Sequence, residues 1–300
     1  MAVAAGVVGL AACGGAAVEQ AAGSGAGPVA PSTTPAEAPG GAAPGAQLGG
    51  PDVGTPDVVG PDADPPLPTR PAWLGTRPLP LRPDGYGEMQ PTPAELVNRA
   101  LPTVDLLPPP ADERFVATVG TVPEQVAGRS TWDPACPVGL DDLRYVTVSF
   151  WGFDGRPHTG ELLLHASVAD DVVEVFRRLH QERFPIEEMR ITTSDELDAH
   201  PTGDGNNTGA FVCRPSRGTT SWSEHAYGRA VDINPFHNPY LKGDVVLPEL
   251  ASAYADRAAS RPGMILRGDV VASAFEAAGW GWGGDWRSSK DYMHFSVNGR

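Results

Sequence analysis

The sequence predicts an α+β domain in which a small antiparallel sheet carries flanking helices. Apolar side chains alternate with polar ones along residues 145–150, and an Asp154-Gly155 turn precedes a second apolar run, which is typical of a β-hairpin. Ser167 then precedes a segment with acidic residues in its first turn and apolar residues at helical spacing, which ends before Pro185. Strands and helices follow without regular βαβ alternation, which favours the α+β class.

Shorter elements are expected elsewhere in residues 130–300, which form the predicted domain. The patterns predict strands at 190–193, 210–214, 230–234 and 292–297, and helices at 248–259 and 269–278. Trp280, Trp282 and Trp286 lie among glycines before the last strand, where they form either the wall of a cleft or part of the core.

The first 129 residues have a different composition. Of the 32 prolines, 22 occur at or before Pro123. A chain rich in Pro, Gly and Ala buries too little apolar surface to offset its conformational entropy, so residues 14–70 are expected to be a disordered linker. Residues 71–129 contain more aromatic and aliphatic side chains, with a short capped helix expected at 92–101. We expect this arm to pack on the domain.

The first thirteen residues, MAVAAGVVGLAAC, form a short apolar run that ends in Leu-Ala-Ala-Cys. This run resembles the lipobox of a bacterial lipoprotein signal peptide, with Cys13 as the lipidated N-terminus, and it is too short for a transmembrane helix. The expected location is the outer face of the cytoplasmic membrane, with the lipid anchor as the contact to the membrane. An Ala-rich start with a chance cysteine is the alternative.

Charge argues against a nucleic-acid partner. The net charge is -15, and the chain contains only two lysines, Lys242 and Lys290. Without a basic patch, binding to a polyanion is disfavoured. The acidity indicates a soluble domain, which we expect to be monomeric.

Two of the seven histidines, His225 and His294, each have an aspartate at a short interval. Gly228 permits a turn between His225 and Asp232, so that these two side chains can meet at one ion. A catalytic zinc takes three protein ligands and a water, so a third donor is needed. His294 is available, and Asp291 lies three residues before it as a spare carboxylate.

A serine hydrolase is the rival chemistry, because Ser223, His225 and Asp232 have the residue types of a catalytic triad. Serine and histidine share one short segment, however, and no GxSxG elbow presents a nucleophile, so this hypothesis is the weaker one. The spacing of His225 and Asp232 alone is weak evidence for a metal site.

The motif SxHxxGxAxD at residues 223–232, together with DxMHF at 291–295, is similar to the zinc D-alanyl-D-alanine carboxypeptidase and L-alanyl-D-glutamate endopeptidase family. This VanY-like group is related in fold to the hedgehog-type domain. The similarity also includes "DLRYVTVSFWGFDG", "FPIEEM", "NNTGAFVCR" and "GWGWGGDW", and so covers roughly residues 131–300. It implies a zinc peptidase that acts on peptidoglycan stem peptides.

The resemblance also implies a role for each matched residue. Asp291 would be the catalytic base, Arg214 would contact the substrate carbonyl, and Ser223 would lie near the substrate. An aspartate as base favours the endopeptidase branch without deciding which bond is cut. The implied ligands of one zinc ion per chain are His225, Asp232 and His294.

Cys136 and Cys213 remain once Cys13 is assigned to the lipid. In an exported protein they are expected to form a disulfide beside Arg214, worth about 4 kcal/mol on the chain-entropy account, and two buried free thiols are the alternative. For function, the alternative to a peptidase is a non-catalytic zinc-stabilised module that binds the cell wall. Asp291 argues against that module, because a structural zinc needs no base.

Overall fold

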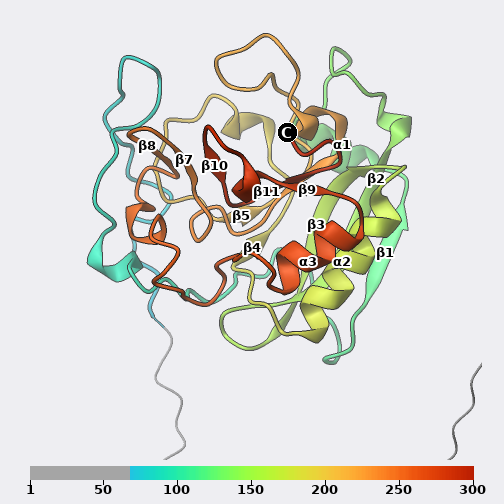
Figure 1. The fold of residues 1–300 in the computed structure, drawn as a ribbon. Helices are drawn as coiled ribbons and strands as arrows, with labels where there is room; N and C mark the ends of the chain where they lie inside the picture. Colours follow the sequence, from blue (N-terminus) through green and yellow to red (C-terminus); the bar gives the residue numbers. More distant parts are fainter. Residues whose placement is uncertain (1–67) are drawn as a thin grey trace, which may run out of the picture. The chain divides into compact units, whose positions relative to one another are not determined.

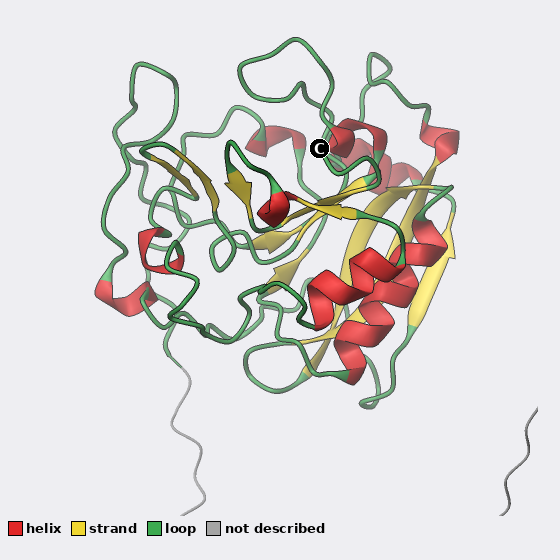
Figure 2. Cartoon of the chain, in the orientation of Figure 1, coloured by secondary structure: helices red, strands yellow, loops and turns green. Residues whose placement is uncertain are grey.

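The computed structural model describes residues 68–300. The expected signal peptide with Cys13, and almost all of the expected linker 14–70, therefore lie outside the described residues. The described chain is mixed α and β with small antiparallel sheets and few helices (Figures 1 and 2), which confirms the expected fold class. None of its helices between residues 68 and 300 has the length and apolar character needed to cross a membrane.

The longest strands form a three-stranded sheet in the order β1-β2-β3. The hairpin expected around Asp154-Gly155 joins β2 to β3, and the register runs from Leu143 opposite His165 to Trp151 opposite Pro157. Helix α2 packs on β2, and α3 packs on α2 (Figure 1), so that the main hydrophobic core lies between them. The bounds are β1 Ala117–Gly120, β2 Leu143–Trp151, β3 Pro157–His165, α2 Ala169–Gln181 and α3 Val270–Ala277.

Three smaller sheets occupy the other half of the described chain. The first is β6-β11-β9, from Ala230–Asp232, His294–Ser296 and Gly281–Trp282. The second is β10-β7-β8, from Lys290–Asp291, Tyr240–Lys242 and Val245–Leu247. The third is a parallel pair, β4 Glu188–Met189 and β5 Asn207–Thr208. Helix α1 covers Glu124–Arg129, and single 3₁₀ turns cover Ala94–Leu96, Leu140–Asp142, Ser194–Glu196, Glu224–Tyr227, Ser252–Tyr254 and Gly283–Asp285.

Two expected helices are wrong, and contacts between them explain why. Residues 92–101 and 248–259 each form only one 3₁₀ turn. The N–H of Arg99 donates to the Tyr254 hydroxyl at 2.8 Å, and the N–H of Ala253 donates to Thr92 Oγ1 at 2.8 Å. These N–H groups donate to side chains of the other segment instead of to a carbonyl one turn earlier, so neither helix continues.

The strands expected at 190–193 and 210–214 are also wrong, whereas those at 230–234 and 292–297 appear, shortened, as β6 and β11. In the second segment, Val212 N–H donates to the His225 carbonyl and Cys213 N–H to Thr131 Oγ1. Because these partners lie on different loops, no continuous ladder forms.

The proline-rich segment from residue 71 contributes to a core of its own. Leu79, Leu96 and Leu101 are buried against side chains from the C-terminal half, among them Phe236 and Tyr254. The same segment supplies β1 as the edge strand of the large sheet. Residues 71–129 therefore contribute both apolar packing and backbone pairing to the folded unit.

Candidate active site

Two neighbouring strands and one turn bring the three expected zinc ligands together. In the antiparallel pair of β6 and β11, Asp232 lies directly opposite His294. His225 lies in the turn Glu224–Tyr227, which ends at Gly228 with φ of 66°. A Cβ at Gly228 would lie 2.7 Å from the backbone N of His165, so this turn requires glycine for its conformation and for its packing.

The distances between the ligand atoms fit a tetrahedral ion. His294 Nδ1 lies 3.1 Å from His225 Nε2 and 3.1 Å from Asp232 Oδ1, and His225 Nε2 lies 3.3 Å from Asp232 Oδ1. Two donors bound at about 2.0–2.1 Å at corners of a tetrahedron lie about 3.3–3.4 Å apart. The three atoms could therefore occupy three corners of a tetrahedral metal site.

Backbone carbonyls orient both imidazoles. His225 Nδ1 bonds the carbonyl of Ala210, and His294 Nε2 bonds the carbonyl of Arg300 at 3.1 Å. A carbonyl only accepts hydrogen bonds, so these nitrogens carry the protons. The opposite nitrogens, His225 Nε2 and His294 Nδ1, face each other and Asp232, and these are the atoms whose lone pairs a metal ion would take.

The charges within the cluster favour an anionic Asp232. Burial opposes ionisation of this carboxyl, but the imidazoles of His225 and His294 hold its pKa far below the ordinary value. Burial likewise opposes the charged form of His294, yet the Asp232 carboxylate raises its pKa to about 9. The site thus attracts positive charge strongly, which a divalent cation would supply.

Asp291 differs from Asp232 because it lacks a partner. It lies on β10, and its Oδ1 is buried without a hydrogen bond from any residue between 68 and 300. Burial and then the charge of Asp232 raise its pKa to about 7. A Cβ at Gly283 would lie 2.6 Å from the Asp291 carbonyl oxygen, so a side chain there would displace Asp291.

The cluster and Asp291 open into one cleft of about 1090 Å³. Arg214 and Ser223 line the same cleft, so every residue expected at the catalytic centre lies on it. Burial lowers the pKa of the Arg214 guanidinium, while the nearby carboxylates Asp232 and Asp291 oppose that shift. Arg214 is therefore close enough to both carboxylates to stabilise negative charge that develops beside them.

Residues 217–297 match the D-alanyl-D-alanine carboxypeptidase family. This match confirms the resemblance that the sequence motifs indicate, and it supports a peptidase. The matched segment contains the three ligands of the cluster together with Ser223 and Asp291, whereas Arg214 and the proline-rich arm lie outside it. Comparisons with curated proteins and with solved structures found no match.

The geometry rules out the serine mechanism at this peptidase site. Ser223 Oγ accepts a hydrogen bond from the backbone N–H of His225 at 3.3 Å and so caps the turn. Both nitrogens of the His225 ring face other groups, Ala210 on one side and His294 on the other. No ring nitrogen is left to take a proton from Ser223.

The three tryptophans expected near the peptidase centre have different positions. Trp280 is buried against Phe275 in the main core, and Trp282 packs on Phe295. Only Trp286, among these three, lines the cleft, with its ring centroid 5.6 Å from that of His294. Both interpretations of the tryptophans are therefore partly right.

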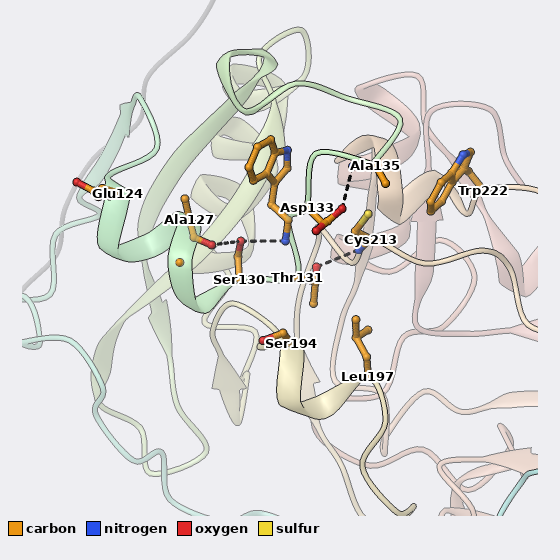
Figure 3. Close-up of a pocket in the computed structure, with 12 residues that line it drawn as sticks. Glu124, Ala127, Ser130, Thr131, Asp133, Ala135, Ser194, Leu197, Cys213 and Trp222 are labelled. Atoms are coloured by element: carbon orange, nitrogen blue, oxygen red, sulfur yellow. Dashed lines mark hydrogen bonds between the residues drawn. The ribbon is translucent and has the colours of Figure 1, made fainter.

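The expected disulfide is present between Cys136 and Cys213, with Cα atoms 5.9 Å apart. Beside it lies a second cavity of about 610 Å³, into which Thr131, Leu197 and Trp222 project (Figure 3). This cavity contains none of the expected zinc ligands. Cys213 directly precedes Arg214, so the bridge anchors the base of the loop that carries the cleft arginine.

Sequence reasoning missed several contributors to the cleft. The carbonyls of Ala210 and Arg300 orient the imidazoles, but any residue type supplies a carbonyl, so no sequence signal marks them. Gly283 was recognisable as part of a glycine-rich run, though its contact with Asp291 was not. Arg70, at the end of the expected linker, and Tyr86 in the arm line the cleft outside every motif.

Proposed function

We propose that this chain is a zinc-dependent peptidase that hydrolyses peptide bonds in peptidoglycan stem peptides, as a D-alanyl-D-alanine carboxypeptidase or an L-alanyl-D-glutamate endopeptidase. One observation carries the proposal: three donor atoms 3.1–3.3 Å apart lie in a cleft with a buried, unpaired carboxylate oxygen on Asp291. A metal site built only for stability has no use for such a carboxylate.

His225, Asp232 and His294 would hold the ion, which when bound supplies Lewis acidity and lowers the pKa of a water. Asp291 accepts the proton of the attacking water at its free Oδ1 and passes it to the departing amine. Arg214 stabilises the negative charge that develops on the carbonyl oxygen, a contribution typically worth about 3–4 kcal/mol of barrier.

The family match supports a wall peptide as substrate, and the expected lipidation of Cys13 supports action outside the cytoplasmic membrane. A proline-rich segment between lipid and domain suits a polymeric substrate that lies away from the bilayer. The chain is proposed to act there as a monomer.

The test is incubation of the purified full-length protein with a stem pentapeptide, followed by mass spectrometry of the products. We expect loss of the terminal alanine for the carboxypeptidase and cleavage beside the first L-alanine for the endopeptidase, and a chelator should stop either reaction. An intact peptide after prolonged incubation with zinc-loaded protein would refute the proposal.

Asp291→Ala separates the peptidase from a non-catalytic wall-binding module. We expect this variant to keep about one zinc per chain and to lose turnover, because the three ligands remain and the base is gone. Turnover at the wild-type rate would show that Asp291 is not the base.

A further inference from the structure

The cleft that contains the peptidase centre has a wall formed outside the matched family segment. Leu74 and Tyr86 of the arm, and Arg70 just before it, line the cleft together with Arg214 and Arg217. The match begins only at residue 217. The arm is therefore placed to influence which substrates reach the zinc cluster.

A tight turn at residues 81–87 holds Tyr86 in this wall. Leu81 and Gly87 form an antiparallel bridge, and Arg82 N–H donates to the Tyr86 carbonyl at 2.7 Å. Gly87 is buried, its N–H donates to Glu249 Oε1 at 2.9 Å, and a Cβ there would lie 2.9 Å from Leu79 Cδ1. The turn is thus closed around Tyr86 and fixed to the body of the domain at Gly87.

The opposite side of the cleft is a hairpin loop that carries Arg217. Pro215 and Trp222 form an antiparallel bridge at its base, and Ser216 N–H donates to the Ser221 carbonyl at 2.9 Å. The loop follows directly after Cys213, which the disulfide ties to Cys136. The loop therefore has a fixed base and presents Arg217 near its tip.

Arg217 and Tyr86 meet. The guanidinium carbon of Arg217 lies 4.4 Å from the centroid of the Tyr86 ring. A guanidinium that stacks by its face keeps its N–H donors free at the edge, in a fork that matches a carboxylate. Within residues 68–300, neither Arg217 nor Arg214 forms an ion pair with a carboxylate, so two cations on this cleft lack an anionic partner.

We propose that Tyr86 and Arg217 form a carboxylate-binding bar across the cleft and that they determine the specificity of the enzyme. The ring of Tyr86 orients the guanidinium, and the free edge of Arg217 binds a carboxylate of the peptide substrate. This inference rests on the proposed function, since the bar selects among peptides that reach the zinc cluster. Stem peptides carry a terminal carboxylate and side-chain carboxylates, and either supplies the required anion.

The experiment compares the full-length wild type with Arg217→Ala, Arg217→Lys and Tyr86→Leu. Arg217→Ala should lower kcat/KM for the stem pentapeptide about 10- to 100-fold, mainly through KM, because a hydrogen-bonded charge contact is lost. Arg217→Lys should fall between, since lysine keeps the charge without the fork. Tyr86→Leu should cost about 3- to 10-fold. Arg156→Ala, at an exposed hairpin turn outside the cleft, is the matched control and should change nothing.

Three peptides identify the carboxylate: the free acid, its C-terminal amide, and the amide with its side-chain carboxylates also amidated. The dependence on Arg217 should vanish when the relevant carboxylate is neutralised, which assigns it to the terminus or to a side chain. If Arg217→Ala weakens all three peptides equally, or none of them, the bar does not bind a carboxylate and the proposal is wrong.

Binding distinguishes failure of the bar from failure of the proposed function. Calorimetry on zinc-loaded Asp291→Ala protein, with and without Arg217→Ala, measures affinity without turnover. If the wild type cleaves none of the peptides but Arg217 still governs affinity for the acid, the proposed function fails and the bar stands. Equal affinity for all three peptides would overturn the bar whatever the activity.

Discussion

Two buried clusters in this fold each combine imidazole with a carboxylate, but their side chains are arranged differently. The first comprises Arg99, Glu187 and His237 with Asn206. Arg99 donates to both Glu187 oxygens at 2.7 Å, and Asn206 donates to one of them at 2.8 Å. His237 Nε2 bonds the Arg99 carbonyl at 2.9 Å. Burial lowers the pKa of His237 to about 4, so the ring is neutral and the cluster is internally satisfied.

The second cluster, His225, Asp232 and His294, also combines buried imidazoles with a carboxylate. Its ligand atoms converge on one another, whereas the polar atoms of the first cluster are divided among several hydrogen bonds. Three donor atoms face a common point, and Asp291 Oδ1 nearby has no partner in the described chain. Composition does not separate the two clusters. The difference is that the polar groups of the first cluster are paired with one another and so stabilise the fold, whereas in the second three ligand atoms converge beside the unpaired Oδ1 of Asp291, as a site for a ligand does.

The largest effect expected from breaking this contrast follows from His225→Ala. Loss of one of three ligands should remove zinc and lower kcat/KM by about 1,000-fold or more, because both the Lewis acid and the activated water go with the ion. Metal analysis and peptide hydrolysis measure the two effects. The free energy of unfolding of the metal-free protein should fall by about 1–3 kcal/mol, because the Ala210 carbonyl and Asp232 lose a buried partner.

His237→Ala is the matched variant in the satisfied cluster. It should leave zinc content near one per folded chain and lower the free energy of unfolding by about 1–3 kcal/mol, because the Arg99 carbonyl and Asn206 lose a buried partner. If His237→Ala released zinc from folded protein, or His225→Ala kept it, the division between the clusters would be wrong.

Glu187→Gln should have the next largest effect, on stability. Removing the charge of Glu187 leaves the Arg99 guanidinium buried without an anion, which typically costs about 3–5 kcal/mol. Arg99 belongs to the arm, so the arm and the body should loosen together. Urea unfolding followed by tryptophan fluorescence measures the loss, and a zinc content that fell before the midpoint would place Glu187 in the metal site instead.

Of the two clusters, only His225, Asp232 and His294 could be predicted from the sequence. His225, Asp232 and His294 were predictable because the motifs SxHxxGxAxD and DxMHF resemble those of a zinc peptidase family, whereas the spacing of His225 and Asp232 alone was weak evidence. The hairpin of β2 and β3 and the helices α2 and α3 were predictable from local periodicity. The hairpin and the two helices depend on neighbours a few residues apart.

The satisfied cluster and the cleft wall were not predictable, because they depend on contacts between distant segments. Arg99 and Glu187 are 88 residues apart, and nothing local marks them as partners. The same contacts explain the two wrong helices, since the backbone N–H of Arg99 bonds Tyr254 and not the preceding turn. Tyr86 likewise becomes part of the cleft only through its contact with Arg217.

The smallest expected effect compares the two carboxylates by their response to pH. Burial and Asp232 raise the pKa of Asp291 from an ordinary 3.8 to about 7, so holding it charged in the folded, metal-free protein costs stability as pH rises from about 4 to 7. Asp291→Asn cannot ionise, and should therefore stabilise the metal-free protein at pH 8, by at most a few kcal/mol, but not below about pH 4.

Glu187 has the opposite sign: although burial opposes its ionisation, Arg99 holds its pKa below 4.5, so its stabilisation is present above that pH and is lost on acidification. Unfolding curves at pH 4 and pH 8 measure both differences, and an Asp291→Asn protein less stable than the wild type at pH 8 would show that Asp291 is a structural carboxylate.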